Sequence, residues 1–163
     1  MCSEYVDDGK FKIIKCVIIC NKTGTYLVGQ TFDPKLNGMM LSSFISAVSM
    51  FGNECMGSLD EISIKGLDID MIVIQKYDLV LIAVMDKGFC DDVIKNRAED
   101  LLDAFFLAYR DELLKPCETH QFEGFEEVLC SRIKSLLEAT NDRKLSDDYH
   151  FDPNRTSVSE RAQ

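Results

Sequence analysis

Tryptophan is absent from this sequence, and proline and histidine are scarce, with 3 and 2 residues respectively. Long hydrophobic runs are also missing: the longest, from Leu79 to Met85, has the length of a strand, whereas a membrane-spanning helix needs about 20 apolar residues. The N-terminal residues MCSEYVDDGK lack the basic and apolar regions of a secretory signal. We therefore expect a cytoplasmic protein with no direct membrane insertion.

Basic residues are few relative to acidic ones. Lysine and arginine together number 18, aspartate and glutamate 28, and the formal net charge is −10. A chain with this balance is repelled by nucleic acids and by anionic membranes. No nucleic-acid partner is therefore expected, and proteins are the expected partners.

Catalytic signatures are missing as well. The sequence has no G-x-x-x-x-G-K-[ST] loop to hold phosphates. The stretch CVIICNKTGTYLVG contains an Asn-Lys pair, as in the Asn-Lys-x-Asp motif that recognises guanine, but Gly24 stands where that motif needs a carboxylate. His120 and His150 lie near no recognisable nucleophile motif. We expect no enzyme and assign no catalytic residue.

The 7 cysteines form no C-x-x-C pair, which argues against a zinc ribbon and a thioredoxin motif. Cys117 and His120 are spaced C-x-x-H, but two further ligands are not evident. Most of the cysteines occupy apolar positions, where a thiol in a reducing compartment acts as a small hydrophobe. The sequence predicts reduced cysteines, no metal site and no cofactor.

What the sequence does contain begins with a predicted β-hairpin. Residues 11–20 are apolar on both alternating faces, which predicts a central strand covered on both sides. Ile14, Cys16, Ile18 and Cys20 are expected on one of these faces. Asn21 to Gly24 supply residues that favour a tight turn, and 25–32 form a second, more mixed strand.

Three further strands are predicted in the middle of the chain. Residues 59–65 alternate between polar and apolar, as an edge strand does. Residues 70–77 are more apolar, and 79–85 are continuously apolar, which predicts a central strand. Short turns join these strands, so neighbours along the chain are expected to pair antiparallel.

Helical periodicity appears in three segments. The first covers 34–56; the second begins at Asp91 and ends before Pro116; the third covers about 123–139. Residues 140–163 have few apolar residues and are expected to form a disordered tail. The expected domain organisation is a short N-terminal segment at 1–10, one folded domain at 11–139 and the tail at 140–163.

These elements predict an α+β fold, a profilin-like α/β/α sandwich. Placing the two doubly apolar strands at the centre and the alternating strands at the edges gives a five-stranded antiparallel sheet of order 2-1-5-4-3. One helix is expected on one face of the sheet and two on the other.

This pattern resembles the longin and roadblock superfamily over about residues 10–139. The opening hairpin KCVIICNKTGTYLVGQTF resembles that of longin domains, and LSSFISAVSMFGNEC with LVLIAVMDKGF resembles stand-alone prokaryotic longin or roadblock proteins. The resemblance implies a non-enzymatic module that binds or regulates a small GTPase in trafficking or signalling, as a homodimer or as a heterodimer with another longin or roadblock protein. Two alternatives stay open: a cargo-binding subunit of an adaptor-like coat, and a small-ligand sensor.

The first helix carries the candidate interface. No charged residue occurs between Lys35 and Glu54, and an uncharged polar face is expected to point outward. The opposite, apolar stripe, which contains Phe44 and Phe51, is expected to cover the sheet. The candidate interface residues are Ser42, Ser46, Ser49 and Asn53 on the helix, with Ile62 and Ile64 on the edge strand. On this hypothesis Ser46→Glu or Ser49→Arg weakens self-association and leaves the fold intact; the alternatives are a face covered by the chain's own tail or a solvated one.

Overall fold

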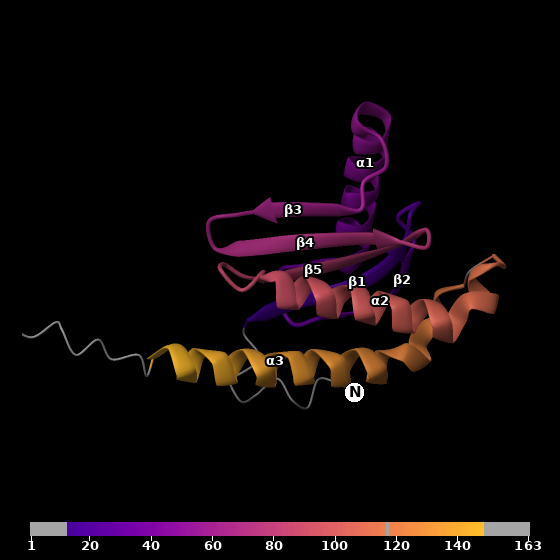
Figure 1. Ribbon diagram of the computed structural model, residues 1–163. Coiled ribbons are helices and arrows are strands. Elements are labelled where there is room, and N and C mark those ends of the chain that lie inside the picture. Colours follow the sequence, from indigo (N-terminus) through magenta and orange to yellow (C-terminus); the bar gives the residue numbers. More distant parts are fainter. Residues whose placement is uncertain (1–12, 117, 149–163) are drawn as a thin grey trace, which may run out of the picture.

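The computed structural model describes residues 13–116 and 118–148 and has a five-stranded antiparallel sheet with helices on both faces (Figure 1). The strands are β1 (Ile14–Asn21), β2 (Tyr26–Thr31), β3 (Glu61–Lys65), β4 (Ile69–Lys76) and β5 (Leu79–Asp86). The helices are α1 (Gly38–Met56), α2 (Asp92–Leu113), the 3-10 helix η2 (Thr119–Phe125) and α3 (Glu126–Asp148). The strand order is β2-β1-β5-β4-β3, so the predicted fold is confirmed.

β1 and β5 form the centre of the sheet because both of their faces are apolar. Every residue from Leu79 to Met85 is buried, and β1 pairs with both β2 and β5. A register shift between Ile14 and Cys16 adds a bulge to β1. Ile14 therefore packs on the face opposite Cys16, rather than on the same face as predicted.

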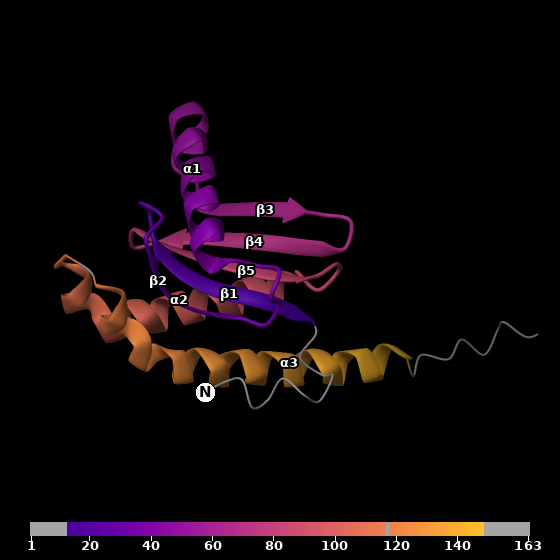
Figure 2. The same cartoon turned by 180° about the vertical axis from the view of Figure 1, so that it is seen from behind.

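The two faces of the sheet are covered unequally. α2 and α3 lie on one face and α1 alone on the other, as predicted (Figures 1 and 2). The larger core cluster lies on the α2 and α3 side, where the rings of Phe105, Tyr109, Phe122 and Phe125 contact one another. On the α1 side the helix contributes a single buried hydrophobic residue, Ile45.

The helical part of the chain extends further than the sequence indicates. α3 continues to Asp148, so residues 140–148 are helical and not part of a tail. The expected N-terminal segment at 1–10 and residues 149–163 lie outside the described residues. Over 13–116 and 118–148, no helix combines the length and the hydrophobicity of a membrane span.

The cysteines differ from the prediction in one respect. Cys16, Cys20, Cys55 and Cys90 are free. Cys130, in contrast, is disulfide-bonded. The prediction that the cysteines are reduced is therefore wrong for Cys130. Burial raises the pKa of the Cys16 thiol to about 12 and that of Cys20 to about 11, so both remain protonated.

Candidate functional site

The orientation of α1 differs from the one predicted: three of the four residues expected to face outward are buried, while Ile45 of the predicted apolar stripe stays in the core. Ser42, Ser46 and Ser49 are buried, with 0%, 6% and 4% of their surfaces exposed, and they face the sheet. Phe44 and Phe51 point outward and are 55% and 69% exposed. The serines therefore cannot form the exposed interface that the sequence predicts, and the apolar stripe takes their place at the surface.

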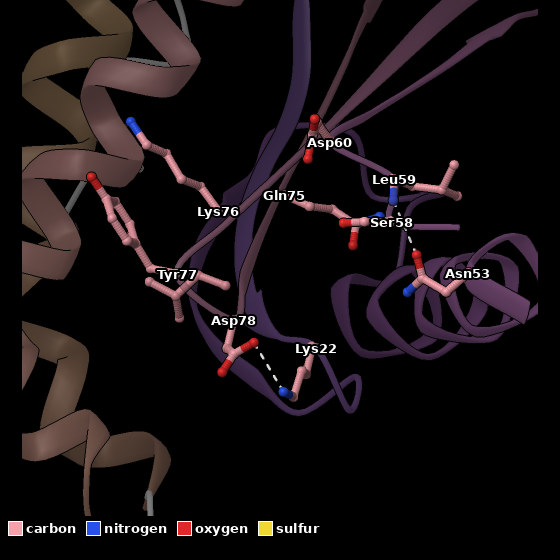
Figure 3. Close-up of a pocket in the computed structure, with 10 residues that line it drawn as sticks. Lys22, Asn53, Ser58, Leu59, Asp60, Gln75, Lys76, Tyr77 and Asp78 are labelled. Carbon is pink, nitrogen blue, oxygen red and sulfur yellow. Dashed lines mark hydrogen bonds and ion pairs between the residues drawn. The ribbon is translucent and has the colours of Figure 1, made fainter. Parts of the chain in front are cut away.

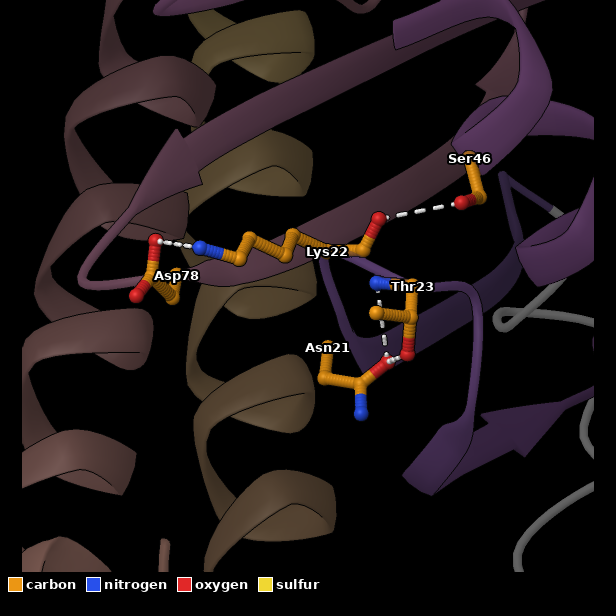
Figure 4. Close-up of polar contacts among 5 residues, drawn as sticks. All are labelled: Asn21, Lys22, Thr23, Ser46 and Asp78. Carbon is orange, nitrogen blue, oxygen red and sulfur yellow. Dashed lines mark hydrogen bonds and ion pairs between the residues drawn. The ribbon is translucent and has the colours of Figure 1, made fainter. Parts of the chain in front are cut away.

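The buried serines have specific partners, which explains why this polar face turns inward. The Ser46 hydroxyl donates to the backbone carbonyl of Lys22 at 3.0 Å, in the turn between β1 and β2 (Figure 4). Gln75 of β4 donates to the Ser49 hydroxyl at 2.9 Å, and the Ser42 hydroxyl donates to the carbonyl of Gly38 at 2.9 Å. Each of these buried hydroxyls thus forms a hydrogen bond, which offsets the cost of removing it from water.

The turn itself is held by Asn21. Its side-chain oxygen accepts from the backbone N–H of Thr23 at 3.1 Å and from the Thr23 hydroxyl at 2.7 Å (Figure 4). It also accepts from the backbone N–H of Thr25 at 2.8 Å. Gly24 has a φ of +88°, which favours glycine. The Asn-Lys-Thr-Gly stretch is therefore a turn, as the sequence predicts, and Asn21 serves to build it.

Small residues let α1 approach this turn closely. A Cβ atom added to Gly24 would lie 2.9 Å from the Cβ of Ser46 and 3.3 Å from the carbonyl oxygen of Ser42. Further along the helix, a Cβ atom at Gly52 would overlap the side chain of Leu59. A larger side chain at Gly24 or at Gly52 would therefore force α1 away from the turn and the sheet.

The outward side of α1 is an apolar stripe, which we define as Met40, Phe44, Ala47, Phe51 and Cys55. These residues recur at steps of three and four and all are exposed. Further exposed methionines flank the stripe: Met39, Met50 and Met56. Large exposed apolar side chains at helical spacing on one side make this surface the candidate interaction site of the described residues.

The remaining predicted interface residues lie at the C-terminal end of α1 and on β3. Asn53 is exposed, and its side-chain oxygen accepts from the backbone N–H of Leu59 at 3.1 Å, so it holds the turn into β3. Ile62 is half-buried against the core on the α1 side, and Ile64 is 37% exposed. Among the strands of residues 13–116 and 118–148, β3 pairs only with β4, so its other edge carries no strand from this part of the chain.

A polar cleft of about 370 Å³ lies between the end of α1 and the β4–β5 turn (Figure 3). Its two lysines are already neutralised. Lys22 pairs with Asp78 at 2.9 Å, and Lys76 pairs with Asp103 of α2 at 2.8 Å. With its positive charges paired in this way, the cleft offers an anion little attraction.

Comparison with known proteins yields similarities of structure only. No family model matches the sequence, and no curated protein matches it. The structure is similar to the roadblock/LC7 domain of Streptomyces avermitilis, with 10% identity, a TM-score of 0.49 and coverage of 68% of this chain and 97% of that one. It is similar to MglB of Myxococcus xanthus, with 16% identity, a TM-score of 0.48 and coverage of 62% and 92%.

A third similarity is to a chain in a homology model of the full-length AP-3 complex, with 14% identity, a TM-score of 0.43 and coverage of 83% and 98%. Independently of these scores, the sheet order and the placement of one helix opposite two are those expected from the resemblance in sequence pattern. The fold is thus the five-stranded α+β arrangement that this resemblance implies.

Proposed function

We propose that this protein is an interaction module that pairs with a second copy of itself through α1 and β3 and that binds or regulates a small GTPase. The observation that supports the module most strongly is the apolar stripe on α1. It includes two exposed phenylalanines, and no charged residue interrupts the helix before Glu54. Large apolar side chains that are exposed in the free chain contribute most to the free energy of association when a partner covers them.

The geometry of α1 supports a second copy as the partner. The C-terminal part of α1 projects beyond β3, past the edge of the sheet (Figures 1 and 2). If the sheet continues into a second copy across this edge, both α1 helices lie on the same face of the joined sheet, and the projecting part of each runs beside α1 of the other copy, where the two apolar stripes can contact each other. The same contact repeats in the other direction, which satisfies the two-fold symmetry of a dimer.

The sequence of β3 suits antiparallel self-pairing. When the two-fold axis passes through Ser63, Glu61 of one copy lies opposite Lys65 of the other. The same register places Ile62 opposite Ile64, and both side chains lie on the α1 side of the sheet. Paired β-branched residues across a strand pair stabilise it modestly, by about 0.2–1 kcal/mol. The charge pair adds less, because Glu61 already pairs with Lys95 of α2 at 2.6 Å.

The GTPase is proposed from the resemblance to longin and roadblock domains. Affinity purification from the native lysate, loaded in parallel with a non-hydrolysable GTP analogue or with GDP, tests this part. A small GTPase that co-purifies in one nucleotide state and is identified by mass spectrometry supports it. Recovery of a large coat-like chain without a GTPase would favour the adaptor alternative.

Self-association is tested by Phe44→Glu in analytical ultracentrifugation. Each dimer contains this position twice, and burying a phenylalanine contributes about 1.5–3 kcal/mol. Losing two such contacts costs about 3 kcal/mol or more, which raises the dimer Kd about 100-fold. The circular dichroism spectrum is expected to be unchanged, because residue 44 is exposed in the monomer.

Leu107→Glu is the matched control. Leu107 is also exposed, at 74%, but it lies on α2 on the opposite face of the sheet. This variant introduces the same charge and is expected to dimerise like the wild type. A wild-type protein that remains monomeric at high micromolar concentration would refute self-association, and equal effects of the two substitutions would refute the assignment to α1.

A further inference from the structure

A second surface feature lies on the other face of the sheet, between α2 and α3. The two helices enclose a groove of about 290 Å³ whose floor is formed by β1 and β5. Small residues leave this space open: Ala83 in the floor, Ala98 on α2, and Ser131 and Ser135 on α3. The volume is at the lower end of the range of about 300–1,000 Å³ that small-ligand pockets occupy.

The groove is where the apolar core remains accessible. Five buried hydrophobic residues among those described keep at least 5% of their surface exposed, and all five line the groove. They are Val17 5%, Ala83 5%, Ile94 7%, Ala98 7% and Leu101 6%. A ligand that enters the groove would therefore contact side chains that are otherwise fully enclosed.

Two arginines stand at the walls of the groove, Arg97 on α2 and Arg132 on α3. Within residues 13–116 and 118–148, neither guanidinium forms an ion pair. Lys15, Lys22 and Lys76, in contrast, all pair with aspartates. In a chain of net charge −10, two unpaired arginines beside an apolar groove are favourable for an anionic group.

We propose that this groove binds a free medium-chain fatty carboxylate. Its alkyl chain lies against the apolar floor, and its carboxylate accepts hydrogen bonds from Arg97 and Arg132. An elongated apolar body with one anionic end matches the division of the lining into an apolar floor and two cationic walls. The site goes beyond the proposed function, because it lies on the face of the sheet opposite α1.

Decanoate is the probe, measured by isothermal titration calorimetry on the full chain, with octanoate and neutral decan-1-ol for comparison. Each buried methylene increases affinity about fourfold, so decanoate is expected to bind about 15-fold more tightly than octanoate. The double variant Arg97→Gln, Arg132→Gln is expected to bind decanoate about 10-fold more weakly and decan-1-ol as the wild type does. Arg110→Gln, on α2 outside the groove, is the matched control and leaves decanoate binding unchanged.

A blocked groove gives an independent measurement. Ser135 is exposed on the α3 wall, so Ser135→Phe fills space without disturbing the core and is expected to abolish binding of both decanoate and decan-1-ol. Circular dichroism confirms that the variant is folded. Absence of saturable decanoate binding to the wild type, or binding unaffected by the arginine and Ser135 variants, would overturn the proposal.

Two other occupants would also overturn it. Decanoate binding that appears only in a full-length Tyr5→Ser, Val6→Ser variant would assign the groove to the chain's own N-terminal segment. Decanoate affinity that increases on dilution of the protein would assign it to a second copy of the chain. None of these outcomes depends on the Phe44 experiment, so the two proposals fail separately.

Discussion

Ser46→Glu is the substitution that most directly tests the orientation of α1. Ser46 is 6% exposed and donates to the Lys22 carbonyl at 3.0 Å. Its Cβ lies only 2.9 Å from where a Cβ on Gly24 would be, so the helix and the turn are already in close contact. A glutamate at this position loses the hydrogen bond, has no room for its longer side chain, and places a carboxylate in a buried site.

The expected loss of stability follows from these three effects. Losing the hydrogen bond to Lys22 costs about 1 kcal/mol, and overpacking costs about 2 kcal/mol. Desolvation of an unpaired carboxylate adds about 1 kcal/mol or more, limited by its partial escape to solvent. The free energy of unfolding should fall by about 4 kcal/mol, which lowers Tm by about 8–16 °C in a protein of this size.

Thermal unfolding followed by far-UV circular dichroism measures this change, with Phe44→Glu as the comparison. Phe44→Glu alters an exposed side chain and should leave the Tm of the monomer nearly unchanged. A Ser46→Glu variant with wild-type Tm and weakened self-association would support the sequence-based orientation, in which the serines face outward, and would refute the one described. Equal Tm losses in both variants would refute the distinction between the two faces.

Two further predictions concern titratable groups. In the Phe44→Glu variant, which is expected to be monomeric, iodoacetamide at pH 8 should label Cys55, which is exposed, and not Cys16, whose pKa is about 12. Mass spectrometry of the tryptic peptides distinguishes the two, and labelling of both in the folded chain would contradict the burial of Cys16. The hydrogen bond from Lys76 lowers the pKa of Asp103, so this pair stabilises the fold above the unfolded carboxyl pKa and the contribution is lost as pH falls through the folded pKa. Asp103→Asn should therefore flatten the acid limb of a plot of unfolding free energy against pH by a small amount, since both side chains are partly exposed, and an unaltered acid limb would contradict this assignment.

The sheet could be predicted from the sequence because strand burial is visible in the residue pattern. β5 is apolar at every position from Leu79 to Met85. Such a continuous apolar run is typical of a central strand that is covered on both faces. β3 alternates and lies at an edge. The bulge at Ile14 escaped prediction, because a bulge changes the side-chain alternation without a distinctive residue type at that position.

The orientation of α1 could not be predicted by the same reasoning. Hydrophobic periodicity assigns the most apolar stripe to the core, which assumes that the helix has no partner outside the chain. Ser42, Ser46, Ser49 and Gly52 share one side of the helix and signal a close contact, as small residues do. The sequence alone predicts a contact with another molecule, whereas the structure shows that the contact is with the chain's own hairpin turn and β4.

The outward stripe of α1 also has a consequence for how two copies meet. The chain carries a net charge of −10, so two copies repel each other at distances within the Debye length, about 8 Å at physiological salt. No charged residue occurs between Lys35 and Glu54, so the stripe itself adds nothing to this repulsion. In the proposed dimer, repulsion elsewhere would disfavour most encounter orientations, so the charge that opposes association in general would also favour encounters through the stripe.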